Sequence, residues 1–457
     1  MPDTSVSPEA ARAPLRLGRV LRLRDLIFYG IVIIQPIAAV PIFGVVQDLS
    51  RGHAVTAVLI AGIAMMLTAF SYGRMAALHP FAGSAYSYVG RGLNPHLGFL
   101  AGWAIALDYL IYPIVAIIQA AFAIERLLPM IPYWGWVIVF VMLLTGVNLR
   151  GIRTTARTNI VLLIAMFVVI GIFLVCVTAH LLHLGGLSAL FSTRPFYNPR
   201  TFDVSAIAAA TSFAALTYIG FDGVTTLAED VRNPKRNVML ATVIVCVFTT
   251  LFSGLLLYLA QLAWPEQQAF ANIETAFMDV TRMVGGASLF QAVGLLILVG
   301  SLGSGMTAQV AAGRLLFAMG RDDVLPRRVF GQLNPATNTP TFNVVLIGAL
   351  ALVGALTLSL EHAGALLNFG AFLSFMGVNL AALYQGWFVR PQGGKRRVVS
   401  DALIPALGFL FCFGMWLSLP TLAKIVGGIW FSAGVAYAAY RTRGFRAPAV
   451  MLDFDQR

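Results

Sequence analysis

Long runs of apolar residues, separated by short polar stretches, recur along the chain from Leu26 to Tyr440. A helix needs about 20 apolar residues to cross a hydrocarbon core of about 30 Å, and about twelve runs of this kind are present. Inside lipid every backbone N–H and C=O must be paired within the protein, and these Gly-rich and Leu-rich runs lack the polar alternation of membrane β-strands. The pattern therefore predicts an all-α integral membrane protein with about twelve transmembrane helices.

The expected spans follow one another with short connections. They are 25–48, 54–78, 97–127, 132–149, 156–181, 203–228, 238–263, 286–312, 341–360, 363–388, 401–419 and 421–440. The composition agrees, because 59% of the 457 residues are hydrophobic and 11% are charged, whereas a soluble domain carries roughly 25% charged residues. No soluble domain is expected between the spans, so function must lie within the membrane.

The formal net charge of +12 is explained by where the basic residues lie. If the polar and basic segment 1–24 is a cytoplasmic tail, 25 of the 31 Lys and Arg residues fall on the cytoplasmic side of the expected spans. The six on the other side are Arg51, Arg126, Arg194, Arg200, Arg282 and Lys424. This asymmetry is the positive-inside rule. It predicts a multi-pass protein of a bacterial inner membrane with both termini in the cytoplasm, and it removes the reason to expect a nucleic-acid partner.

Two of the expected helices carry helix-breaking residues near mid-membrane depth. The first contains Gln35-Pro36 and Pro41, and the sixth contains Gly220-Phe221-Asp222-Gly223. Interrupted helices at corresponding places in two halves of a chain are typical of inverted-repeat transporters, whose substrate site lies at the breaks. Pro and Gly also kink spanning helices without any binding role. Taken alone, each break is explained equally well as a simple kink and as part of a binding site. Their matched positions favour a transporter.

Two acidic residues lie inside expected spans, where a charged side chain costs at least about 2.5–3.5 kcal/mol unless it faces a cavity or a partner. Asp222 follows Gly220 at the second break. It is a candidate for binding a substrate ammonium group, for taking up a proton, or for capping the half-helix that begins there. Asp108 lies in the third span. A substrate contact and a hydrogen bond to a neighbouring helix explain Asp108 equally well.

Aromatic residues near these acids are candidates for enclosing an alkylammonium group by cation–π attraction. They are Tyr109, Tyr112, Tyr218 and Phe221. Plain packing is the alternative for each. Tyr218 and Phe221 are the stronger candidates because they flank the second break.

Other chemistry is not indicated. The three Cys residues each lie within an apolar run and are expected to pack there, and the six His residues have no metal-ligand spacing. Nucleotide-binding and hydrolase motifs are absent. We therefore expect no metal, no cofactor and no enzyme activity.

The segment from Tyr218 to Asn237, which contains Gly-Phe-Asp-Gly and Glu-Asp-Val-Arg-Asn-Pro, resembles the signature of amino acid–polyamine–organocation permeases. The segments 80–88 and 313–322 support this resemblance, which covers nearly the whole chain. Within that superfamily the segments 94–99, 107–113, 321–331 and 367–371 look most like those of bacterial putrescine importers.

The resemblance implies a LeuT-like fold with two inverted five-helix repeats, and it implies that helices one, three, six, eight and ten line a central site. The repeats would be 25–181 and 203–388, followed by two helices in 401–440 and a cytoplasmic tail in 441–457. Helices one and six are expected to be discontinuous. The predicted substrate-binding residues are Ile34, Gln35, Pro36, Ala38, Asp108, Tyr109, Tyr218, Gly220, Phe221 and Asp222.

Two departures from the family pattern bear on the substrate and its coupling. Many related permeases have Gly-Ser-Gly in the first break, where backbone N–H groups bind the substrate carboxylate, but this chain has Pro36-Ile37-Ala38. Pro36 has no N–H, which disfavours a carboxylate and is compatible with a diamine. The fifth span lacks the Lys that replaces a sodium ion in some proton-coupled relatives.

The leading hypothesis is a proton-coupled importer of a small cationic amine such as putrescine. Its alternatives are a broad amino acid permease or exchanger and, from another class, a membrane receptor that does not transport. The coupling ion and the oligomeric state stay open.

Overall fold

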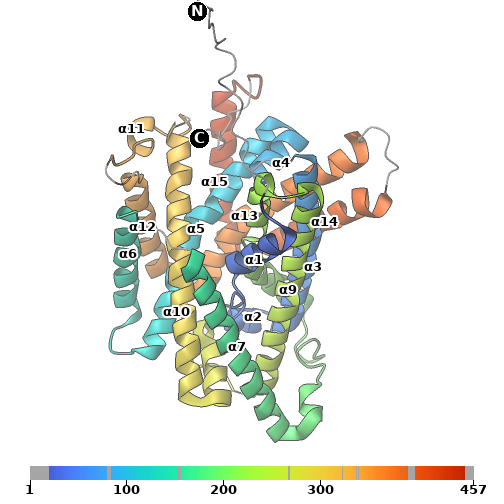
Figure 1. Cartoon of the computed structure of the whole chain (residues 1–457), viewed down its shortest axis with the longest axis vertical. Helices are drawn as coiled ribbons and strands as arrows, with labels where there is room; N and C mark the ends of the chain where they lie inside the picture. Colours follow the sequence, from blue (N-terminus) through green and yellow to red (C-terminus); the bar gives the residue numbers. More distant parts are fainter. Residues whose placement is uncertain are drawn as a thin grey trace, which may run out of the picture.

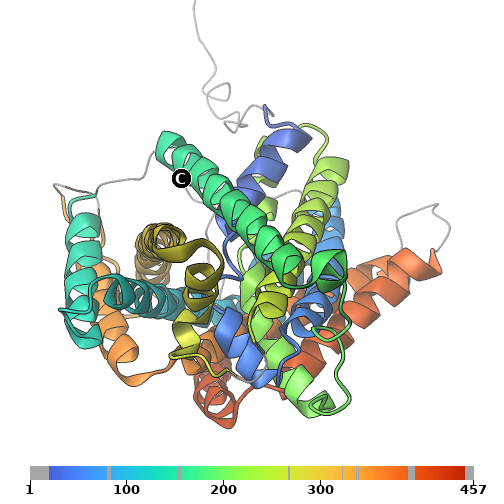
Figure 2. The ribbon, with the colours of Figure 1, turned by 90° about the horizontal axis from the view of Figure 1, so that it is seen from below.

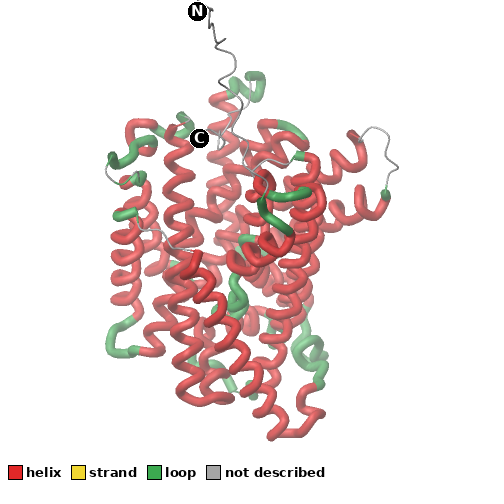
Figure 3. The backbone as a smooth tube through the Cα atoms, in the orientation of Figure 1, coloured by secondary structure: helices red, strands yellow, loops and turns green. Residues whose placement is uncertain are grey.

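The computed structural model describes residues 20–79, 84–151, 156–265, 268–321, 323–335, 337, 339–389 and 397–447. Most of the two predicted tails and residues 80–83 of the resemblance segment 80–88 lie outside these ranges. The described chain is helical, as predicted (Figure 3). Its β-type pairing is limited, in the described ranges, to an isolated parallel bridge between Leu21 and Val231.

The helices of the first half are α1 (Leu23–Ile34), α2 (Phe43–Leu49), α3 (Ala54–Leu78), α4 (Ser84–Gly92), α5 (Pro95–Leu127), α6 (Tyr133–Leu149), α7 (Ala156–Gly185) and η2 (Gly186–Leu190). Those of the second half are α8 (Val204–Ala214), η3 (Ala215–Tyr218), η4 (Phe221–Asp230), α9 (Pro234–Ala263), η5 (Ile273–Thr275), α10 (Ala276–Arg321), α11 (Arg327–Phe330), α12 (Thr341–Thr357) and α13 (Leu360–Leu383). The chain ends in η6 (Tyr384–Val389), η7 (Val399–Leu403), α14 (Ile404–Leu417) and α15 (Thr421–Arg441).

Eight helices in the described part of the chain are long and apolar enough to cross a membrane, and the bent pair formed by α8–η3 and η4 makes up to nine. Two further apolar helices, α6 and α12, are shorter, with 17 residues each. The helices of the first expected span are α1 and α2, which are separated by a non-helical stretch. The protein is therefore a multi-pass membrane protein built from helices.

The longest helix differs from the expected span 286–312. It begins at Ala276 and ends at Arg321, and Figure 1 shows α10 running along the length of the bundle. Gly286, with φ of 70°, bends this helix near its start. The span expected from the sequence ends at residue 312, which leaves Arg314 in a loop, but in the structure Arg314 lies inside the helix. A charged residue is tolerated there, since its long side chain on the last turns of the helix can reach the membrane surface.

Close helix contacts at small residues hold the centre of the bundle together. Gly370 of α13 lies so near α5 that a Cβ there would be 2.2 Å from the carbonyl oxygen of Ala104. One turn later, the Ser374 hydroxyl donates a hydrogen bond of 2.8 Å to the carbonyl of Ala101. Small residues and hydroxyl groups are the usual means of close packing between membrane helices. In Figure 2, seen from below, α7 crosses this bundle obliquely.

Candidate functional site

The first break lies between α1 and α2. The helix ends at Ile34, and Gln35 has φ of 66° and ψ of 130°, a conformation that residues other than Gly rarely adopt. Pro36 follows and has no N–H, so it cannot make the helical hydrogen bond to residue 32. The chain then passes through turns, in which the N–H of Ala38 donates to the Gln35 carbonyl at 3.1 Å. The predicted break in the first helix is therefore present.

The Gln35 side chain connects this break to α10. Its Nε2 donates a hydrogen bond of 3.4 Å to the carbonyl of Gly300. A Cβ at Gly300 would lie 3.2 Å from Gln35 Oε1 and the same distance from Ile37 Cδ1. The lack of a side chain at Gly300 lets α10 approach the break closely.

The second break lies between η3 and η4, where the two helical segments meet at an angle of 41°. Gly220 has φ of 103°, which a residue with a Cβ adopts only with strain. A Cβ at Gly220 would lie 2.5 Å from Cγ2 of Ile33, and a Cβ at Gly223 would lie 3.1 Å from Cδ1 of the same residue. The two breaks are therefore in contact, and the glycines of the sixth helix make room for Ile33.

The two acidic residues come together near these breaks. Asp222 at the start of η4 and Asp108 in the middle of α5 are close enough for their charges to interact. Tyr88 and Tyr109 also lie near Asp222. Tyr109 is 40% exposed and lies near Tyr29 of α1, which is 37% exposed. The structure thus gathers two carboxylates and partly accessible tyrosines from α1, α5 and η4 into one region.

Two predicted site residues contact neighbouring helices. The Tyr218 hydroxyl donates a hydrogen bond of 2.9 Å to the carbonyl of Val58 in α3, and Tyr218 is fully buried. Phe221 is also fully buried, and its ring centroid lies 5.5 Å from Tyr72 and 5.2 Å from Phe375. In this conformation both side chains anchor the second break to α3 and α13.

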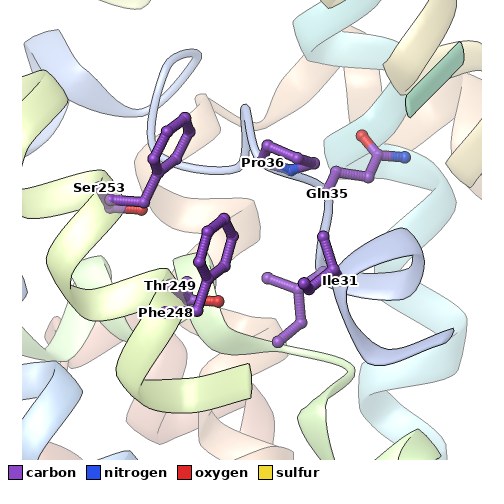
Figure 4. Close-up of a pocket in the computed structure, with 8 residues that line it drawn as sticks. Ile31, Gln35, Pro36, Phe248, Thr249 and Ser253 are labelled. Carbon is purple, nitrogen blue, oxygen red and sulfur yellow. The ribbon is translucent and has the colours of Figure 1, made fainter. Parts of the chain in front are cut away.

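A small pocket opens beside the first break (Figure 4). It is lined by Ile31, Ile34, Gln35, Pro36, Phe248, Thr249, Phe252 and Ser253. The last four belong to α9, so the pocket lies between α1 and α9. Neither Asp108 nor Asp222 lines it. Of the predicted residues, Ile34, Gln35 and Pro36 therefore line this pocket, whereas the two acids and Tyr109 form a separate group.

The arrangement of two broken helices around two half-buried acids agrees with what comparison of the sequence shows. Residues 26–438 match the family described as amino acid permease. The chain belongs to this family. It is 34% identical to the low-affinity putrescine importer PlaP of Escherichia coli over 97% of this chain and 98% of that protein. It is 26% identical to the branched-chain amino acid permease BcaP of Lactococcus lactis, over 93% and 95% of the two chains. A vacuolar cationic amino acid transporter of Arabidopsis thaliana is 27% identical over 83% of this chain and 65% of its own.

Membership of the permease family makes this protein a membrane transporter and not an enzyme, with a small amine or amino acid as its class of substrate. In the described part of the permease, no group of three or more His, Cys, Asp or Glu side chains is placed to hold a metal ion.

Sequence reasoning missed Asn368 of α13 as a residue that shapes this permease's site. It is fully buried, and its Nδ2 donates to the carbonyl of Ser212 at 2.7 Å and to that of Phe213 at 3.5 Å. Asn368 thus ties α13 to the end of α8, where that helix passes into η3 ahead of the second break. An amide in the middle of an apolar span was the available signal.

Proposed function

We propose that this permease imports a small cationic amine such as putrescine by alternating access. The observation that carries the proposal is that Asp108 and Asp222 lie close enough for their charges to interact, beside the helix breaks. Two neighbouring carboxylates repel each other, and each attracts an ammonium group. A substrate with two ammonium groups can place one beside each acid, so the pair favours a dication over a neutral amino acid.

The residues around the acids suit the methylene chain between two ammonium groups. Tyr109 and Tyr29 present partly exposed aromatic rings beside the acids, and aromatic faces attract alkylammonium groups. Pro36 supports the same preference, because it removes one N–H with which the first break would bind a substrate carboxylate. The similarity to a putrescine importer over 97% of this chain agrees with this choice.

We further propose twelve spans in the LeuT-like arrangement, with repeats 25–181 and 203–388. Nine candidate spans, together with the shorter helices α6 and α12 and the broken α1–α2 pair, are consistent with this number. The distribution of basic residues supports both termini in the cytoplasm of a bacterial cell. Bending of helices one and six at their breaks would open the site to each side in turn.

Uptake of labelled putrescine into proteoliposomes tests the proposal. We expect uptake that an inward proton gradient stimulates, and we expect Asp108→Asn and Asp222→Asn each to reduce it at least about tenfold while the protein stays folded. Asp48→Asn is the matched control, because Asp48 is exposed at the end of α2, and it should transport normally. Absence of putrescine uptake by the wild type, together with clear uptake of a neutral amino acid, would refute the diamine substrate. Normal uptake by both acid variants would refute the proposed site.

A broad amino acid permease is the second candidate, because branched-chain and cationic amino acid transporters are also among the relatives. Competition experiments separate the two. If Leu or Arg displaces labelled putrescine as well as unlabelled putrescine does, the site accepts amino acids. In that case Pro36→Gly, which restores a backbone N–H, should strengthen amino acid binding.

A further inference from the structure

His53 lies in the turn between α2 and α3, at the far end of these helices from the start of α1, and it is fully buried. The turn is compact, since the N–H of His53 donates to the Ser50 hydroxyl at 2.9 Å. The loop that leads from η2 to α8 packs against this turn. Phe202 of that loop contacts the imidazole edge-on, with 5.3 Å between the ring centroids.

Both ring nitrogens of His53 take part in hydrogen bonds to backbone groups. Nδ1 lies 2.9 Å from the carbonyl oxygen of Ser50, which can only accept. Nε2 lies 3.0 Å from the backbone N–H of Asn198, which can only donate. The ring must therefore carry its proton on Nδ1 and accept with Nε2, and this is possible only for the neutral imidazole.

We infer that His53 is a proton-sensitive clasp between the α2–α3 turn and the loop that enters α8. Protonation of Nε2 places a second donor opposite the Asn198 N–H, so that this hydrogen bond is lost and a charge is buried without a partner. Imidazole is the side chain whose ordinary titration falls between about pH 5 and pH 8. Acidification of this face of the protein should release the loop from the turn.

Other charged groups lie near His53. The charged or titratable residues on the elements packed around His53 are Asp48, Arg51, Arg194, Tyr197, Arg200, Asp203 and Tyr258. Arg51 forms an ion pair of 3.1 Å with Asp203, the first residue before α8. Hydrogen bonds from the backbone N–H groups of Ala206 and Ser205 hold the pKa of Asp203 below its ordinary value. This ion pair therefore persists at mildly acidic pH.

Further hydrogen bonds hold the same loop without involving His53. The Thr56 hydroxyl of α3 donates to the carbonyl of Phe196 at 2.8 Å. Arg194 donates to the carbonyl of Gln261 in α9 at 3.0 Å. The loop is thus fixed at several points, and His53 is the point that a proton can release. The clasp joins the outer half of the broken first helix, through the turn that follows it, to the outer half of the broken sixth helix. Its effect on transport rests on the proposed function.

Hydrogen exchange of the Asn198 amide, followed by mass spectrometry on the full-length protein in nanodiscs, tests the clasp directly. After correction for the intrinsic pH dependence of exchange, protection of the peptide that contains Asn198 should fall about tenfold or more between about pH 7.5 and pH 5, the size expected for one buried hydrogen bond. The helical amides of α3 are the internal reference, and their corrected protection should stay constant. Equal corrected protection at the two pH values would overturn the proposal.

Two variants at position 53 provide a matched pair. In His53→Gln the side-chain oxygen can accept from Asn198 and does not titrate, so protection should be high at both pH values. In His53→Asn the side chain is too short to reach Asn198, so protection should be low at both. Thr56→Val removes a neighbouring tie to the same loop and should lower protection while leaving its pH dependence intact. A pH-dependent loss in His53→Gln equal to that of the wild type would assign the effect to another group.

The exchange measurement and the uptake measurement fail independently. Exchange reports the clasp in the absence of any substrate, so a wild type that shows the pH-dependent release but no putrescine uptake refutes the proposed function and leaves the clasp intact. A wild type that transports putrescine without pH-dependent release refutes the clasp alone.

Discussion

Replacement of Gly220 by Ala is the sharpest test of the second helix break. The backbone of Gly220 has φ of 103°, and an added Cβ would lie 2.5 Å from Cγ2 of Ile33. A left-handed backbone costs a residue with a Cβ about 1–2 kcal/mol, and overpacking costs about 1–3 kcal/mol, so the expected loss of unfolding free energy is about 2–5 kcal/mol.

The loss should divide into a backbone part and a contact part. Ile33→Ala removes the colliding methyl groups, so the Gly220→Ala change should cost less in that background than in the wild type. The remaining cost is the backbone strain. A double-mutant cycle measured by unfolding in mixed micelles gives both parts. Putrescine uptake by Gly220→Ala should fall as well, because relief of the strain shifts the break.

Gly303→Ala is the matched control. Gly303 lies in α10, and apart from the nearby backbone of its own helix no atom lies within 4 Å of an added Cβ. Because Ala is favoured over Gly inside a helix by about 0.5–1 kcal/mol, this variant should be as stable as the wild type or slightly more stable. If Gly220→Ala and Gly303→Ala unfolded alike, the left-handed backbone and the Ile33 contact would not determine the break.

Three further predictions concern stability. Arg74 and Asp401 form an ion pair of 2.6 Å with side chains only 20% and 13% exposed, so Arg74→Ala should lower the unfolding free energy by about 1–3 kcal/mol. The control is Arg24→Ala, because Arg24 and Asp25 form a pair whose side chains are 79% and 40% exposed, and this variant should change the unfolding free energy little. Equal effects of the two variants would contradict this reasoning. The pKa of Asp203 is lowered from 3.8, so its charge stabilises the fold above that pH, and this contribution disappears as the pH falls through the lowered value. The thermal stability of Asp203→Asn should therefore be below that of the wild type at neutral pH and converge with it in acid. A constant difference between the two would exclude the linkage. A Cβ at Gly434 would lie 2.4 Å from Trp103, and the indole N–H groups of Trp103 and Trp430 donate to each other's backbone carbonyls at 2.8 Å. Gly434→Val should therefore cost about 1–3 kcal/mol in the same unfolding assay. An unchanged stability would show that α15 does not depend on this contact.

The positions of the breaks were predictable from the sequence, but the directions of their side chains were not. Pro36 and Gly220 interrupt helices for reasons that are local to the backbone, so the residue types were sufficient. Tyr218 and Phe221 were candidates for a substrate box, yet they contact α3 and α13. Which way a side chain next to a break points depends on helices that are distant in sequence, and a single sequence carries no record of those contacts.

The pairing of the acids shows the same division. Asp108 and Asp222 were each marked by their place in an apolar run, and the resemblance to a known family suggested that their helices meet. The closeness of their charges appears only when α5 and η4 are placed in the same bundle. Asn368 was missed for a related reason: an amide in a membrane helix identifies no partner until the carbonyls of α8 are placed beside it.

Helices one and six are tied to each other at three levels, and the ties differ in chemistry. At one end Leu21 and Val231 form a parallel bridge, with the Leu21 N–H donating to the backbone carbonyl of Asp230 at 3.0 Å. In the middle Ile33 packs on Gly220. At the other end His53 accepts from Asn198. Backbone bridges and apolar contacts do not respond to protons between pH 5 and pH 8, whereas imidazole does. Acid on the His53 face should therefore loosen that end while the bridge and the central contact persist, so protonation favours separation of the two helices at one end only.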